Sequence, residues 1–145
     1  MIRYNLPEID PEGFKELLQL ESYLESINWI KPYVLLIKIR ASQINNCAYC
    51  LKMHTSEAIE SGETMKRISL LSKWRLERIF SEQEKLILKI TEAVTFISNN
   101  GLTNSLYREL ETHFTTKQIS QIVFAIGLIN LWNRVVIASG ITIKN

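Results

Sequence analysis

Two capping boxes, each opening a long run of apolar residues at helical spacing, constrain the fold of this chain more than any other feature. One spans Ser81 to Glu84 and the other spans Thr115 to Gln118. In such a box the first hydroxyl accepts a hydrogen bond from the N–H of the fourth residue, whose side chain bonds back to the first residue. The first box therefore predicts a helix that stops at Asn99-Asn100-Gly101, and the second predicts a final helix toward Gly140. The first helix carries an apolar stripe of Leu86/Ile87, Ile90, Ala93/Val94 and Ile97.

Start and stop signals predict five further helices, and no segment alternates convincingly between apolar and polar residues. We therefore expect an all-α bundle of about six to seven helices. The first of the five begins at Asp10-Pro11-Glu12 and carries the stripe Leu17, Leu20, Leu24 and Ile27, and the second spans Tyr33 to Ile44. The third runs from Asn46, its N-cap, to Gly62. The fourth spans Thr64 to Trp74 with the apolar face Met65, Ile68, Leu71 and Trp74, and the fifth spans about 103 to 113.

The bulk properties of the chain limit its class and its partners. At 145 residues it fits a single domain, 1–145, that can bury roughly two thirds of its unfolded surface without staples. The net charge of +2 comes from 17 basic and 15 acidic residues without a basic block, so we expect no nucleic-acid partner. The N-terminus lacks the apolar core of a secretion signal, and we expect a cytoplasmic protein with reduced thiols.

The final helix is apolar nearly all round between Ile122 and Ile129, which predicts burial inside the bundle or at a subunit interface. Asn130, Asn133 and Arg134 interrupt its apolar run, so we expect a buried helix and no membrane span. A homo-oligomer is the natural inference. The segment Trp132-Asn133-Arg134 has two interpretations: site residues, or anchors for packing and hydrogen bonds.

The stretch from Asn46 to His54 gathers both cysteines and one of the two histidines, and it predicts a thiol redox site. If the stretch is helical, Cys50 lies about 60° and His54 about 20° from Cys47 around the axis, so all three share one face. The helix N-terminus and the imidazole both lower a thiol pKa, which raises the reactive thiolate fraction. We expect Cys50 to exchange a proton with His54 and Cys47 to meet an external reductant.

Three other interpretations of the cysteine pair exist. A structural staple is poorly supported, because a loop between residues three apart restrains the unfolded chain little. A zinc site would need a fourth ligand, and only His113, on another predicted helix, is available; we therefore expect no metal. Inert burial is the third, because free cysteines and Met53 are ordinary core residues.

A wider set of motifs carries a family resemblance: Ser42 to Cys50 leading to His54, then Gly62, Trp74 and the segment 130–134. From about Leu24 to Ile137 the chain resembles the carboxymuconolactone decarboxylase family, specifically its alkyl hydroperoxidase D (AhpD)-like branch. The resemblance implies an all-α fold that assembles into homo-trimers or homo-hexamers. It also implies a peroxidase site in which Cys50 is peroxidatic, Cys47 is resolving and His54 belongs to the proton relay. An external dithiol such as a lipoyl group would regenerate the site, without a bound cofactor.

Two positions depart from the peroxidase pattern. The relay glutamate that these peroxidases carry ahead of the cysteines is Leu35 here, and Tyr49 stands where the best-known type has a histidine. A general acid or base is typically worth 10² to 10⁴ in rate, so we expect weakened peroxidase activity unless water or Lys38 compensates. A corollary is that Leu35→Glu should raise any peroxidase rate.

We therefore weigh three functions. The leading hypothesis is a thiol-dependent redox enzyme that reduces hydroperoxides or a partner disulfide. The second is a family member that binds or transforms a small organic molecule without thiol chemistry, as the decarboxylases do. The third is an oligomeric redox sensor whose disulfide changes its assembly.

Overall fold

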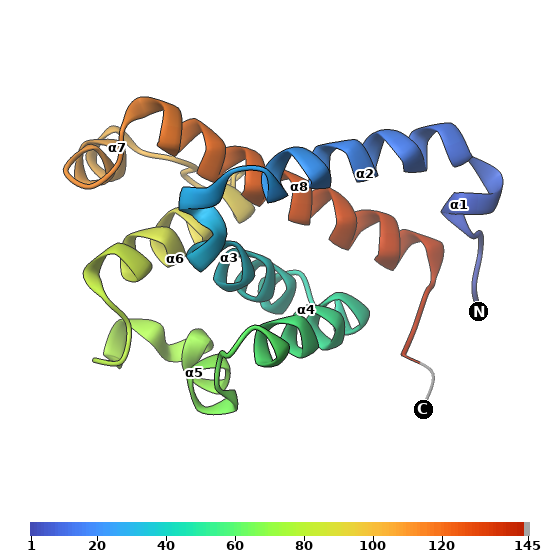
Figure 1. Ribbon diagram of the computed structural model, residues 1–145, viewed down its shortest axis with the longest axis horizontal. Helices are drawn as coiled ribbons and strands as arrows, with labels where there is room; N and C mark the ends of the chain where they lie inside the picture. Colours follow the sequence, from blue (N-terminus) through green and yellow to red (C-terminus); the bar gives the residue numbers. More distant parts are fainter. Residues whose placement is uncertain (144–145) are drawn as a thin grey trace.

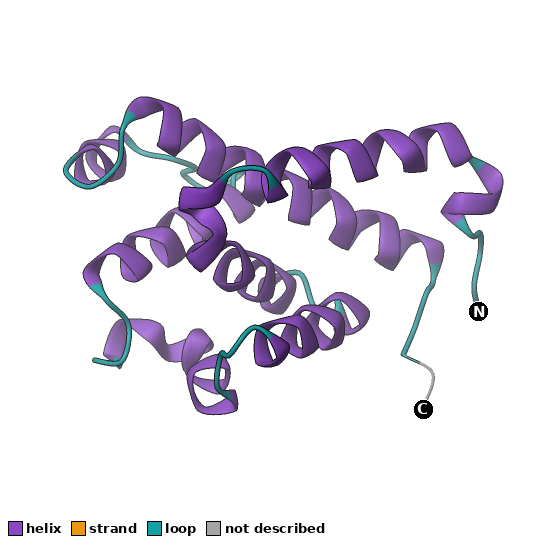
Figure 2. Cartoon of the chain, viewed as in Figure 1, coloured by secondary structure: helices purple, strands orange, loops and turns teal. Residues whose placement is uncertain are grey.

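The computed structural model describes residues 1–143, and within that range the chain is helical without a strand (Figure 2). The all-α prediction is confirmed. All seven predicted helices are present, and the single-turn α1 is an addition to them. The elements are α1 (Leu6–Ile9), α2 (Pro11–Glu25), the 3-10 helix η1 (Asn28–Ile30), α3 (Lys31–Ile44), α4 (Ala48–Glu60), α5 (Met65–Leu70), the 3-10 helix η2 (Leu71–Leu76), α6 (Glu82–Thr95), α7 (Asn104–Glu111) and α8 (Thr116–Ser139).

Helix α3 is the central element of the bundle. Figure 1 shows it nearly end-on, and it packs against α4, α6 and α8. Its sequence is apolar on opposite sides, so Ile37 and Ala41 enter one hydrophobic cluster while Leu36 and Ile39 enter another. Helix α3 therefore separates two apolar clusters and joins the helices that form them.

The larger cluster lies between α3, α6, α7 and α8, and the smaller one lies under α4, α5 and η2. A fully buried isoleucine or leucine side chain contributes about 1.5–3 kcal/mol through the hydrophobic effect, so these clusters supply most of the stabilisation. The larger cluster includes Leu86, Ile87, Ile90, Leu110, Ile122, Ile126 and Ile129. The smaller cluster includes Ala58, Ile68, Leu71, Trp74, Phe80 and Leu88.

The predicted helix ends are largely confirmed. Ser81 and Thr115 both form complete capping boxes at the starts of α6 and α8. Gly140 ends α8 with φ of 76°, in the left-handed region that favours glycine. Gly62, with φ of 95°, follows α4 in a Schellman motif, because its N–H bonds the carbonyl of Ile59 and the next N–H bonds that of Ala58.

Three residues of the predicted apolar stripes are exposed, and those assignments were wrong. Leu20 is 37 % exposed because only the C-terminal part of α2 is buried, ending at Leu24. Met65 is 59 % exposed because it is the first residue of α5. Ile97 is 63 % exposed because α6 ends at Thr95, before the stripe is complete.

Helix α8 is, among the described helices, the one long and apolar enough by length and composition to cross a membrane. Core helices of soluble proteins pass the same test, and 44 % of its most apolar window is buried inside the molecule. It packs against α2, α3, α6 and α7. Helix α8 therefore contacts helices along much of its length within the bundle.

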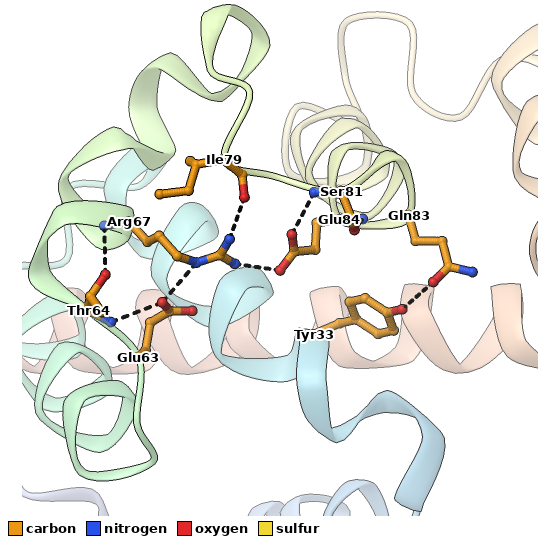
Figure 3. A network of polar contacts seen from close by, with 8 residues as sticks. All are labelled: Tyr33, Glu63, Thr64, Arg67, Ile79, Ser81, Gln83 and Glu84. Carbon is orange, nitrogen blue, oxygen red and sulfur yellow. Dashed lines mark hydrogen bonds and ion pairs between the residues drawn. The ribbon is translucent and has the colours of Figure 1, made fainter.

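Two polar clusters fasten the smaller apolar cluster to the rest of the fold. Figure 3 shows the first, in which the Arg67 guanidinium bonds the carboxylates of Glu63 (2.9 Å) and Glu84 (2.5 Å) and the carbonyl of Ile79 (2.7 Å). It ties the start of α5 to the start of α6, where Ser81 and Glu84 form the capping box. The bond from Arg67 to the Ile79 carbonyl therefore holds the loop before α6 against α5.

The second polar cluster surrounds Glu92 of α6. Its carboxylate accepts hydrogen bonds from Arg40 (2.9 Å) and from the Trp74 indole (2.8 Å), and it forms an ion pair with Arg75 (2.5 Å). Burial acts to raise the pKa of Glu92, but the hydrogen bonds from Arg75, Trp74 and Arg40 outweigh burial and lower it. Glu92 therefore links α6 to α3 and η2 as an anion.

Candidate functional site

The connection between α3 and α4 consists of three residues, 45–47, and the last of them, Cys47, is the N-cap of α4. Asn45 is the C-cap of α3, and Asn46 adopts a left-handed conformation with φ of 55°. The N–H of Cys47 bonds the carbonyl of Ser42, and the N–H of Asn46 bonds that of Gln43, so α3 ends in a Schellman motif. The prediction that Asn46 is the N-cap of the next helix was wrong. Asparagine tolerates the left-handed region well, and it ends α3 instead.

A disulfide joins Cys47 and Cys50, whose Cα atoms are 5.3 Å apart. Cys47 is the N-cap of α4 with non-helical dihedral angles, and Cys50 is the third residue of the helix. Both residues are at most 2 % exposed. The shared-face prediction therefore applies to Cys50 and His54, while Cys47 lies at the helix tip. Both sulfur positions lie in the positive field of the helix N-terminus, which favours a thiolate once the disulfide is reduced.

A network of side-chain amides anchors this connection to α8. The Asn45 amide donates to the Oδ1 atoms of Asn130 and Asn133, at 2.9 Å each. Asn133 is fully buried and donates in turn to the Ser42 hydroxyl at 3.0 Å. Sequence reasoning missed Ser42 and Asn45 as positioning residues. The one available signal was a pair of asparagines in the otherwise apolar α8, which need polar partners when buried.

The neighbours of Asn133 also act as anchors. The Trp132 indole donates to Glu21 of α2 at 2.9 Å, and Arg134 bonds the backbone carbonyl and Oδ1 of Asn130. Of the two interpretations of Trp132-Asn133-Arg134, these contacts favour packing and hydrogen-bond anchors.

His54 lies one turn after Cys50 and is 4 % exposed. Cys50, His54 and Ala58 are the buried residues of α4, and their spacing of four residues forms one stripe. The His54 Nδ1 atom lies 2.8 Å from the Glu57 Oε2 atom. Burial lowers the pKa of His54, and the Lys38 charge lowers it further, against the opposing effects of Glu57 and Glu21. His54 is therefore neutral near pH 7 and able to accept a proton.

Leu35 and Lys38 line a groove of about 570 Å³ together with Glu21 and Glu57. Lys38 forms an ion pair with Glu21 at 2.9 Å, so its ammonium is held on α2. Sequence reasoning sought a carboxylate on α3 and missed Glu57. The available signal was its place three residues after His54, the spacing at which helical side chains meet. The gain expected from Leu35→Glu stays a prediction.

A second groove, of about 410 Å³, opens beside the disulfide. Cys47 lines it with Asn46 and Tyr49 from the start of α4, and with residues from both ends of the chain. The two chain ends meet where the Arg3 N–H bonds the Ser139 carbonyl at 2.7 Å. Of the two cysteines, Cys47 is the one that lines this groove.

Within residues 1–143, no three His, Cys, Asp or Glu side chains gather closely enough to hold a metal ion. His113, the ligand that a zinc site would need, lies beyond α7 with its ring centroid 6.4 Å from that of Phe114.

Comparison with known proteins agrees with this geometry. The model of the carboxymuconolactone decarboxylase family matches residues 31–93. YdfG, an uncharacterized protein of Bacillus subtilis (strain 168), is 38 % identical over 138 residues, which cover 95 % of this chain and 94 % of YdfG. The chain belongs to the carboxymuconolactone decarboxylase family. The family match contains the disulfide, His54 and Leu35 but does not reach the asparagines of α8.

The chain is also similar to a solved structure and to a second bacterial relative. A crystal structure from Agrobacterium tumefaciens, of a protein of unknown function suggested to be the antioxidant defence protein AhpD, has a TM-score of 0.94 at 36 % identity and covers 100 % of this chain and 99 % of its own. YnjA, an uncharacterized protein of Escherichia coli (strain K12), is 25 % identical over 96 residues, or 66 % of this chain and 52 % of YnjA. The Agrobacterium structure thus has the same fold as residues 1–143 of this chain.

Proposed function

We propose that this member of the carboxymuconolactone decarboxylase family is a thiol-dependent redox enzyme of the alkyl hydroperoxidase type. The observation that carries the proposal is the Cys47–Cys50 disulfide at the N-terminus of α4 with buried His54 one turn below it. A disulfide between residues three apart adds little stability, and two cysteines at a helix N-terminus are suited to reversible oxidation.

The reaction has three steps. His54 takes the proton of the Cys50 thiol, the thiolate attacks the terminal oxygen of a hydroperoxide, the O–O bond breaks, and the alkoxide takes that proton back from His54 to leave as an alcohol. The Cys47 thiol then attacks the Cys50 sulfenic acid and forms the disulfide, releasing water. An external dithiol finally reduces the disulfide to two thiols and becomes a disulfide itself. No bound cofactor takes part.

Access to the disulfide supports the assignment of Cys47 as the resolving residue. Cys47 lines the groove of about 410 Å³, so an incoming dithiol meets its sulfur there. The same groove supports a second candidate, exchange with a disulfide of a partner protein. Both reactions need a compartment that supplies reducing equivalents, and we propose the cytoplasm.

The test is peroxide consumption by the reduced protein with excess dithiothreitol, compared with Cys50→Ser across pH. We expect turnover in the wild type and none above background in the variant, and the pH midpoint reports the essential ionisation. Wild-type turnover no higher than that of Cys50→Ser, in protein whose thiols are titrated as reduced, would overturn the peroxidase assignment. Reduction of a model disulfide by the same samples would then decide for the second candidate.

We further propose that the protein assembles as a homo-trimer or homo-hexamer, as its family resemblance implies. Tyr49 and Met53 of α4 support this, because they are 39 % and 42 % exposed and share a shallow groove with Ile143. Light scattering on the purified protein would measure the mass, and a monomeric mass would contradict the proposal.

A further inference from the structure

We propose that Glu57 is the residue that positions His54 and stabilises its protonated form, so that helix α4 itself supplies a carboxylate where the sequence lacks one at Leu35. This inference rests on the proposed redox role of Cys50 and adds a positioning residue to it. The geometry that points to Glu57 is the 2.8 Å contact between its Oε2 atom and His54 Nδ1.

The contact determines which imidazole nitrogen can act on the thiol. An ionised carboxylate only accepts hydrogen bonds, so Nδ1 of His54 carries the proton that it shares with Glu57. The hydrogen bond at one ring nitrogen sets the state of the other, which leaves the Nε2 lone pair free to accept a proton. Glu57 therefore holds His54 in the tautomer that a general base needs.

The direction of helical side chains places the three groups in one line. Side chains of a helix lean toward its N-terminus, so His54 leans toward Cys50 and Glu57 leans toward His54. Their numbers differ by four and then by three, which keeps all three on one face of α4. Cys50 and His54 are buried while the Glu57 side chain is 47 % exposed. The line thus runs from the buried sulfur to solvent.

The other charges around His54 leave Glu57 as its direct carboxylate partner. From α3, Lys38 acts on His54 but is paired with Glu21 of α2. From α8, which also packs against α4, Arg134 is bonded to Asn130. Leu35 lines the same groove as Glu57, so a carboxylate at Leu35 would add a like charge beside the one already there. An apolar residue at Leu35 is consistent with a relay whose carboxylate lies on α4.

The proton balance of the first step uses both residues. His54 takes the proton of the Cys50 thiol, and Glu57 stabilises the resulting imidazolium through Nδ1. The thiolate attacks the hydroperoxide, and the imidazolium returns the same proton to the alkoxide that leaves. His54 ends the step neutral and Glu57 remains ionised throughout.

The test measures thiolate formation at Cys50 without peroxide. The reduced wild type, Glu57→Gln and the matched control Glu60→Gln are alkylated with iodoacetamide between pH 5 and 9, and tandem mass spectrometry measures the modification of Cys50 separately from that of Cys47. Glu60 is an exposed residue of the same helix. We expect Glu57→Gln to move the alkylation midpoint to higher pH and to slow the reaction at pH 7 roughly tenfold, part of the 10² to 10⁴ typical of a general base. Glu60→Gln should match the wild type.

A Glu57→Gln profile that superimposes on the wild type would overturn the role of Glu57. A shift of equal size in Glu60→Gln would also overturn it, because it would show a general charge effect. Peroxide consumption by the wild type is measured separately. Its absence would reject the proposed peroxidase, while the alkylation profiles still decide whether Glu57 acts through His54.

Discussion

Removal of the Asn133 side chain tests whether the amide network holds the connection that carries Cys47. Asn133 is fully buried, accepts a hydrogen bond from Asn45 and donates one to the Ser42 hydroxyl. In Asn133→Ala the Asn45 amide keeps its bond to Asn130, but the Ser42 hydroxyl, also fully buried, loses its donor. One lost hydrogen bond costs about 0.5–1.5 kcal/mol and an unsatisfied buried group about 1–3 kcal/mol, so we expect about 1.5–4.5 kcal/mol in total.

The assay is urea unfolding of the oxidised protein in a double-mutant cycle of Asn133→Ala and Ser42→Ala. Each single variant leaves one buried polar group without its partner, whereas the double variant removes both groups. The double variant should therefore cost less than the sum of the singles, with a coupling energy of about 0.5–3 kcal/mol. Lys117→Ala, at an exposed position of the same helix away from the amide network, is the control and should stay within about 0.5 kcal/mol of wild type. Additivity of the two single changes would refute the reasoning.

Two further predictions test other parts of the fold. Glu92→Gln should destabilise the protein by about 1.5–3 kcal/mol at pH 7. Because the pKa of Glu92 is lowered from 4.5, the stability that its carboxylate contributes is present above pH 4.5 and is lost as pH falls through the lowered pKa. The unfolding curves of variant and wild type should therefore converge in acid, and a gap that persists would contradict this. Gly140→Ala should cost about 1–3 kcal/mol more stability than Gly62→Ala in thermal unfolding. Both glycines have positive φ, but an added Cβ overlaps the Met1 carbonyl oxygen at Gly140 and meets nothing within 4 Å at Gly62. Equal costs would show that the overlap is relieved.

Local interactions explain what the sequence predicted correctly. The capping boxes at Ser81 and Thr115 involve residues three apart, so their geometry follows from the chain itself. The same holds for Cys50 and His54, which face the same side because they are one turn apart on α4. The all-α fold and the buried final helix needed no more than apolar periodicity and these end signals.

The wrong or missing assignments depend on contacts that local patterns do not reveal. Asn46 is the middle residue of the three that connect α3 and α4, and asparagine suits both an N-cap and a left-handed helix end. Only the backbone hydrogen bonds from Asn46 and Cys47 to the carbonyls of α3 distinguish an N-cap from a left-handed helix end. The partners of Asn45 lie 85 and 88 residues further along the chain. Glu57 is one of several polar residues on α4, and its contact becomes informative only once His54 is known to be buried.

The two kinds of contact divide the site into a local part and a long-range part. Cys50, His54 and Glu57 belong to one helix, so their mutual placement depends on the integrity of α4 and little else. Cys47 precedes that helix, and its position depends on the end of α3 and, through Ser42 and Asn45, on α8. Changes in the amide network should therefore act on Cys47 and on disulfide formation, while the ionisation of Cys50 follows changes within α4. In the proposed mechanism the helix that carries the thiol also carries its base and the partner of that base, so the carboxylate need not come from position 35 of α3.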